Sequence, residues 1–257
     1  SVVPRSSPSQ SSSSYSTRTV ARRPGQPWYK EKTSIGVACC RFYRGRPQII
    51  MIQKRYTYAY SSFVHGAYEG GGDRAILALL NQMTVDEKII LQSLNFDLIW
   101  AHIWLTQSPH DTQKYRIMRG IFDAAFVRDG NSMRLHDLIA RSVHGMRVWE
   151  IPKGRTRKGE ADIHCAVREF YEETGIEESQ YYIYPNATRS HTFVDDGVQY
   201  VQKYYIASTH RPIQPRICLD ARVQIEEVAD IRWMSIDDIR FVDQSGRLER
   251  LIRTIFN

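Results

Sequence analysis

The first half of the chain changes from a strand-like to a helix-like pattern of apolar residues. Apolar residues cluster at 34–42 and again at 48–54, which predicts two strands joined by a short turn. Beyond Tyr56 they recur every three or four positions, the spacing of one face of a helix. Thr84 and Glu87 have the spacing of a capping box and should open one of these helices. The expected helices cover 73–83, 84–94, 97–105, 111–126 and 132–143.

The second half returns to strands and ends in helices. Residues 195–197, Asp-Asp-Gly, have the composition of a hairpin turn. A mixed sheet with helices on its faces buries such elements economically. We therefore predict an α/β fold in which 31–58 and 146–257 form one domain and 59–145 form an inserted all-helical lobe. The expected strands cover 147–151, 181–184, 189–194, 200–208 and 228–234, and the last helices 236–239 and 246–256.

Charge and composition set the N-terminal segment apart from the rest. The formal net charge is +7 over 257 residues. Residues 1–30 hold five of these charges and no acid, in a Ser-, Pro- and Arg-rich composition that cannot build a core. We expect a disordered tail that adds non-specific attraction to nucleic acid. No apolar run approaches the roughly eighteen residues of a membrane span, and no secretory signal is recognisable. The four cysteines lack zinc spacing, which favours packed thiols in a reducing compartment.

The densest charge cluster lies in the stretch 154–176, GRTRKGEADIHCAVREFYEETGI. Glu169, Glu172 and Glu173 have the i, i+3, i+4 spacing that places side chains on one face of a helix. Their mutual repulsion stabilises a helix poorly, whereas divalent cations such as Mg²⁺ prefer carboxylate oxygens. A solvated acidic face is the alternative interpretation. Arg168 lies beside the cluster and has the chemistry to hold one carboxylate in place.

The whole stretch matches a longer pattern, G-x5-E-x7-R-E-U-x-E-E-x-G-U with U apolar, at every defined position. This pattern resembles the signature of the Nudix hydrolases, and the chain is identified as a member of that superfamily. The resemblance implies an α/β/α sandwich that cleaves a pyrophosphate bond in a nucleoside diphosphate linked to a further group. It also implies Mg²⁺ or Mn²⁺ as cofactor, held by Glu169, Glu172, Glu173 and the backbone carbonyl of Lys153. Arg168 would orient a glutamate.

Two glutamates outside this triplet have roles that the sequence leaves open. Glu160 is either an outer metal ligand or a structural contact between the loop and the helix. Glu227 stands at the family's distance from Trp233 for a general base on a loop before a late strand. In the alternative, Glu226 and Glu227 form an exposed loop and Glu169 is the base.

Basic residues before the acidic helix are candidates for contacts to substrate phosphates. Lys153, Arg155 and Lys158 lie next to the carboxylates in sequence, and their cationic groups can bind phosphate oxygens. We favour Lys153 and Arg155 among them. The alternative is a solvated basic loop.

Segments before the stretch 154–176 narrow the choice of substrate. Residues 149–154, Trp-Glu-Ile-Pro-Lys-Gly, resemble the entrance segment of mRNA-decapping and diphosphoinositol-phosphate Nudix proteins. The Ser-Ile-Gly-Val start at 34–37, the Gln-Lys-Arg-Tyr at 53–56 and the helical insertion resemble the decapping enzymes of large nucleocytoplasmic DNA viruses. This resemblance implies a viral protein of the host cytoplasm that binds capped mRNA, releases 7-methyl-GDP and 5′-monophosphate RNA, and contributes to host shutoff.

The same resemblance makes the helical lobe the expected RNA-binding surface. Phosphate contacts dominate RNA affinity and carry little sequence information, so exposed cations are the candidates. Each of them is otherwise an ordinary solvated charge. Two alternatives remain: hydrolysis of inositol pyrophosphates at the same site, and a non-catalytic RNA-binding module, which the intact set of acids disfavours. The candidate RNA contacts are Lys88, Lys114, Arg116, Arg119 and Arg141.

Overall fold

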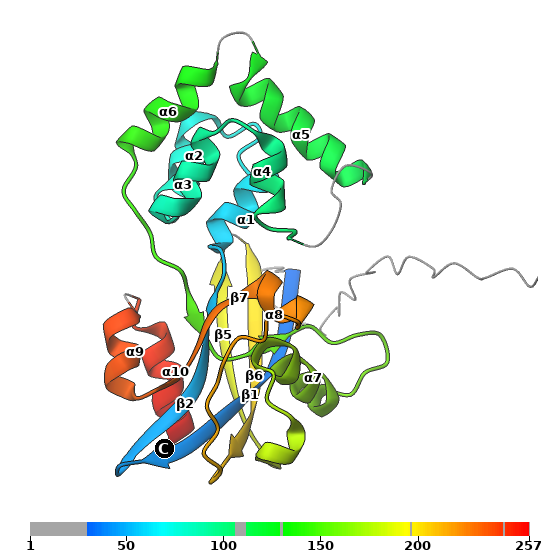
Figure 1. Cartoon of the computed structure of the whole chain (residues 1–257), viewed down its shortest axis with the longest axis vertical. Coiled ribbons are helices and arrows are strands. Elements are labelled where there is room, and N and C mark those ends of the chain that lie inside the picture. Colours follow the sequence, from blue (N-terminus) through cyan, green and yellow to red (C-terminus); the bar gives the residue numbers. More distant parts are fainter. Residues whose placement is uncertain (1–29, 106–111, 129–130, 196, 244, 257) are drawn as a thin grey trace, which may run out of the picture.

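A mixed sheet between two layers of helices forms one part of the molecule, and a helical lobe forms the other (Figure 1). The computed structural model describes residues 30–105, 112–128, 131–195, 197–243 and 245–256. The expected tail therefore lies outside the described residues, except for Lys30, which begins the first strand. The predicted α/β class, with a mixed sheet and an inserted set of helices, is confirmed. No helix of the described residues is long and apolar enough to cross a membrane.

Two long neighbouring strands organise the sheet. β1 and β2 pair antiparallel across a tight turn, where Arg44 and Gly45 have φ values of 51° and 75°. β1 pairs in parallel with β6 along its other edge, and all other strand pairs of the sheet are antiparallel. The strands are β1 (Lys30–Tyr43), β2 (Arg46–Lys54), β3 (Trp149–Glu150), β4 (Lys153–Gly154), β5 (Tyr182–Asp195), β6 (Val198–Ser208) and β7 (Val228–Met234).

Alternating side chains bury both faces of this sheet. Val37 and Cys39 of β1 share a buried cluster with Phe170 of α7 (Asp162–Thr174). Ala38, between them, belongs to a second cluster with Ile252 of α10. Continuous apolar strands are what a sheet covered on both faces requires. α8 (Arg222–Glu227) lies on the α7 side, and α9 (Ile236–Val242) and α10 (Arg247–Phe256) on the opposite side (Figure 1).

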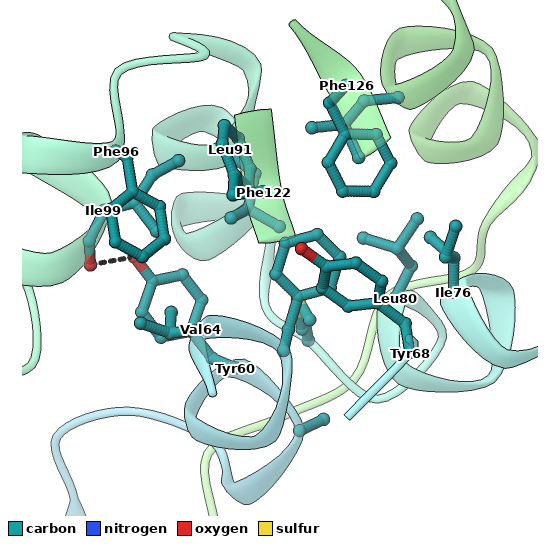
Figure 2. Packing of buried hydrophobic residues seen from close by; sticks show 14 of the residues in the cluster. Tyr60, Val64, Tyr68, Ile76, Leu80, Leu91, Phe96, Ile99, Phe122 and Phe126 are labelled. Carbon is teal, nitrogen blue, oxygen red and sulfur yellow. Dashed lines mark hydrogen bonds between the residues drawn. The ribbon is translucent and has the colours of Figure 1, made fainter. Parts of the chain in front are cut away.

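The lobe has an aromatic core of its own. Phe63 stacks on Phe126 with ring centroids 5.7 Å apart. The hydroxyl of Tyr60 donates to the carbonyl of Ile99 at 2.9 Å (Figure 2). Trp100 is buried in the same cluster. The lobe helices are α1 (Tyr58–Val64), α2 (Gly72–Leu80), α3 (Val85–Gln92), α4 (Phe96–Ala101), α5 (Gln113–Phe126) and α6 (Ser132–Arg141).

Three of the differences from the sequence predictions concern α1, β5 and α8. α1 was not expected as a separate helix, because its cap at Thr57 follows a strand without a turn signal. The strands expected at 181–184 and 189–194 are one strand, β5, interrupted by an irregularity between Ile183 and Thr188. A helix, α8, replaces the loop expected around Glu227. Its six residues are too few to show a helical period.

Candidate active site

The helix α7 packs one side on the sheet core and carries its acidic residues on another side. Cys165, Ala166 and Phe170 on one side of α7 are buried against the sheet. Gly175 ends the helix in a left-handed conformation, φ 69°, which glycine adopts without a steric penalty. The remaining face carries the three glutamates of the predicted metal site.

Arg168 holds the carboxylates of this face together. Its Nη1 donates to Glu169 at 2.6 Å and to Glu172 at 3.0 Å, so both carboxylates lie beside one nitrogen. Its Nε and Nη2 donate to the two oxygens of Glu160 at 2.7 and 2.9 Å. These hydrogen bonds lower the pKa of Glu160 to about 2. In this arrangement Glu160 connects the loop to the helix, which is one of the two roles that the sequence left open.

Gly154 gives the carboxylate of Glu169 its space. A Cβ at position 154 would lie 1.9–2.3 Å from the carboxylate atoms of Glu169. Any other residue would therefore push this carboxylate away from the loop. Burial raises the pKa of Glu169, and the hydrogen bond from Arg168 opposes this shift. Gly154 is thus required by the site and not by a turn.

Glu173 is the most buried of the three glutamates, with a side chain only 2% exposed. It accepts hydrogen bonds from Nζ of Lys54 at 3.1 Å and from the backbone N–H of Lys153 at 2.8 Å. Burial raises its pKa to about 7, and Lys54 opposes that shift. Two donors thus hold this carboxylate at the base of the site.

Lys54 also brings Glu227 to the site. Its Nζ donates to Glu227 at 2.9 Å, so one ammonium connects buried Glu173 with a carboxylate that is 45% exposed. Glu227 is the last residue of α8, and its backbone carbonyl accepts from the N–H of Arg55 at 2.9 Å. The structure places Glu227 beside the acidic helix, at a position accessible to solvent.

Sequence reasoning missed Lys54 and Glu150. Nζ of Lys153 lies 2.6 Å from Glu150, and the hydroxyl of Tyr58 donates to the same carboxylate at 2.8 Å. Burial acts to raise the pKa of Glu150, but the two neighbouring lysines lower it. The available signal was a lysine and a glutamate within short buried strands, where charged residues are rare unless paired.

The predicted substrate-binding residues separate into two groups. The side chain of Lys153 is 8% exposed and paired with Glu150, so its ammonium does not face solvent as expected. Arg155 and Lys158 are exposed on the loop before α7. Arg157, next to them, pairs with Glu172 at 2.9 Å.

The donor chemistry of this face fits a divalent cation. Glu169, Glu172 and Glu173 supply the carboxylate oxygens that hard cations prefer. Within the described residues, however, no three His, Cys, Asp or Glu side chains are already arranged to hold a metal ion. The oxygens instead accept from Arg168 and Lys54. A bound cation would replace these groups as the partner of some of the oxygens.

The lobe places its predicted RNA contacts in different surroundings. Lys88 departs from expectation: it is buried, and its ammonium donates to Ser142 Oγ at 2.7 Å and to the carbonyl of Val143, so it is a structural residue of the lobe. α5 starts on one side of the lobe and α6 ends on the other (Figure 1). The exposed candidates are Lys114, Arg116 and Arg119 on α5, and Arg141 at the end of α6.

The chain is similar in sequence to known proteins. The NUDIX domain model matches residues 123–254. The chain is 32% identical over 235 residues to the mRNA-decapping protein g5R of African swine fever virus, covering 88% of this chain and 93% of that protein. The chain belongs to the Nudix hydrolase family. It is also 20% identical to a putative mRNA-decapping protein of Acanthamoeba polyphaga mimivirus, over 82% of this chain and 64% of the relative.

Structural likeness to solved proteins is weaker. The crystal structure of the C. elegans Ap4A hydrolase aligns with a TM-score of 0.43 and 13% identity, covering 87% of this chain and 95% of that chain. Nudix hydrolases generally use divalent metal ions, in accord with the acidic face of α7.

Proposed function

We propose that this Nudix hydrolase removes the 5′ cap of mRNA by hydrolysing its pyrophosphate bridge in the presence of Mg²⁺ or Mn²⁺. The products are 7-methyl-GDP and 5′-monophosphate RNA. The observation that carries the proposal is the acidic face of α7 with Glu227 opposite it, connected through Lys54. The similarity to g5R supports the choice of substrate, because it extends across both the lobe and the sheet domain.

In this proposal each residue of the site has a defined task. Glu169, Glu172 and Glu173, with the carbonyl of Lys153, would hold the cation. When bound, the cation would supply Lewis-acid chemistry that offsets the charge of the phosphate oxygens and favours deprotonation of water. Glu227 accepts a proton from the attacking water, and Lys54 orients its carboxylate toward α7.

The substrate is held at two places. Exposed Arg155 and Lys158 contact the phosphates of the cap bridge. Cations on α5 and α6 bind the phosphates of the RNA body, because such contacts supply affinity without sequence preference. The enzyme would act in the cytoplasm of an infected cell, where capped mRNA is available.

Cap-labelled RNA tests the proposal directly. Wild-type protein with Mg²⁺ or Mn²⁺ should release 7-methyl-GDP, and Glu172→Gln should lower the rate roughly a hundred-fold or more, because a charged group of the site is lost. Glu178→Gln is the matched control, since Glu178 is exposed on a short 3-10 helix (Glu178–Gln180) after α7. Release of 7-methyl-GDP by Glu172→Gln at the wild-type rate would contradict the role of the acidic face.

Competing substrates separate the remaining alternatives. The relatives described above give no support to inositol pyrophosphates. Activity on inositol pyrophosphates without any cap hydrolysis would nevertheless replace the proposal with that alternative. Tight binding of capped RNA with no product under either metal would indicate a non-catalytic RNA-binding module.

A further inference from the structure

The lobe and the sheet domain have separate hydrophobic cores. The buried cluster of the lobe is drawn from residues 59–139. The two clusters that flank the sheet are drawn from 35–52 and 151–255. None of these three buried clusters contains residues of both parts. Polar contacts between the two parts therefore contribute to fixing the orientation of the lobe relative to the sheet domain.

Arg55 makes the most extensive of these contacts in the described residues. Its Nη2 donates to the carbonyls of His102 and Ile103, just after the end of α4 in the lobe, the latter at 3.0 Å. Its Nε donates to the carbonyl of Glu226 in α8 at 2.8 Å, and its backbone N–H to the carbonyl of Glu227. One guanidinium thus holds backbone groups of both parts of the molecule.

The residues that Arg55 holds are next to the reacting groups. Glu227, the proposed base, follows Glu226 directly and is the C-terminal residue of α8. Lys54, which pairs with Glu227 and Glu173, precedes Arg55. A shift of Arg55 would therefore move the backbone of Glu227 and the ammonium that orients its carboxylate.

We propose that Arg55 is a positioning residue that couples the lobe to Glu227, so that the base is held over α7 only while the end of α4 is docked on the same guanidinium. This inference rests on the proposed function for the identity of the reaction. A substitution of Arg55 should therefore lower kcat without changing the affinity for RNA.

A planar guanidinium suits this role better than an ammonium. Its five N–H donors lie in a fixed fork and can serve several carbonyls at once, whereas a lysine offers a single flexible point charge. Arg55→Lys should therefore retain the positive charge but not the simultaneous hydrogen bonds to the lobe and to α8. The hydrogen bond between Tyr58 and Glu150 also connects the two parts, so the fold does not depend on Arg55 alone.

Kinetics on capped RNA test the coupling. Arg55→Gln and Arg55→Lys should lower kcat roughly 10- to 100-fold, because misplacing a catalytic group by about 1 Å has effects of this size. The Kd for capped RNA, measured with calcium in place of magnesium, should change less than about two-fold. Arg74→Gln, on the exposed face of α2, is the matched control and should leave both constants unchanged.

A double-mutant cycle distinguishes positioning from general destabilisation. If Arg55 acts through Glu227, then Arg55→Gln should not lower the residual kcat of Glu227→Gln further, because coupled residues are non-additive. A second drop of the same factor would overturn the proposal while leaving cap hydrolysis intact. Thermal unfolding of each variant verifies that the fold is retained.

Hydrogen exchange gives an outcome that is independent of activity. In Arg55→Gln, amides in peptides covering 99–105 and 222–230 should both exchange faster than in wild type, with Arg55→Lys intermediate and Arg74→Gln unchanged. Wild-type exchange in either peptide would overturn the coupling even if the wild-type protein proved inactive on capped RNA. Absence of 7-methyl-GDP from wild-type protein would overturn the proposed function alone.

Discussion

At the scale of single residues, the acidic face depends on the absence of a side chain at Gly154. Gly154→Ala would place a methyl group where the carboxylate of Glu169 lies. We expect a loss of activity of at least ten-fold, because Glu169 must move away from its position beside Arg168. Steady-state hydrolysis of capped RNA and thermal unfolding measure the two effects separately.

A second glycine provides the control for this substitution. Gly120 lies within α5, and a Cβ there would meet no atom within 4 Å. Gly120→Ala should therefore raise stability by about 0.5–1 kcal/mol through helix propensity and leave catalysis unchanged. Equal activity of the two alanine variants would contradict the role assigned to Gly154.

His102 makes stability depend on pH. Burial, with help from Arg55 and Arg147, lowers the pKa of His102 from 6.5 to about 4. The unfolded chain therefore takes up a proton below pH 6.5 that the folded protein binds only near pH 4. This contribution is favourable above pH 6.5 and is lost as the pH falls from 6.5 to 4.

His102→Gln removes this titration. When the pH is lowered from 7.5 to 4.5, the free energy of unfolding measured with urea should fall more for the wild type than for the variant. The difference between the two proteins isolates His102 from the glutamates, which titrate in both. Parallel curves over that range would show that His102 is as easily protonated in the folded state as in the unfolded chain.

At the scale of elements, one buried glutamate caps two helices. Glu87 accepts from the backbone N–H of Thr84 at 2.9 Å, in the predicted capping box. It also accepts from the N–H and hydroxyl of Thr57, the cap of α1, at 2.6 and 2.9 Å. The start of the lobe is therefore fixed by the same carboxylate that opens α3.

Glu87→Gln should destabilise the protein by about 1–3 kcal/mol, because an amide offers one acceptor oxygen to three donors in a buried site. Chemical denaturation monitored by circular dichroism measures the change. Glu69→Gln, at an exposed position between α1 and α2, should stay within about 0.5 kcal/mol of wild type. A neutral effect at Glu87 would mean that these hydrogen bonds contribute nothing net.

At the scale of the whole molecule, RNA affinity should depend on where the cations lie. Lys114→Glu/Arg116→Glu, at the start of α5, should raise KM for long capped RNA several-fold. It should also reduce the slope of log affinity against log salt by about 0.7 for each phosphate that the variant no longer neutralises. The cap dinucleotide should be cleaved equally by wild type and variant, because it does not reach the lobe.

The control for this variant lies at the other end of the molecule. Arg44→Glu/Arg46→Glu makes the same charge change at the turn between β1 and β2, on the side of the sheet away from the lobe (Figure 1). An equal loss of affinity in this control would indicate long-range electrostatics and not a surface on the lobe. Filter binding over a range of salt concentrations separates the two cases.

The sequence by itself determined the local features of this protein. The acidic face of α7 and the cap at Thr84 each depend on residues within one or two helical turns, so spacing and residue type were sufficient. Alternating and continuous apolar runs likewise predicted the mixed sheet, because strands that are buried on both faces are apolar at successive positions. Short elements such as α1 and α8 have no comparable pattern in the sequence.

Only the tertiary structure decided how distant charges pair. Lys54 contacts Glu173 and Glu227 across 119 and 173 positions of the chain, and no local pattern specifies such a pairing. The same holds for Lys88, which looks like a surface charge in sequence but is buried among Ser142, Val143 and His144. Long-range pairing depends on which strand ends and helix ends meet in space. The residue types of the acidic helix are therefore specified by local sequence, whereas the residues that contact its glutamates are determined by the tertiary fold.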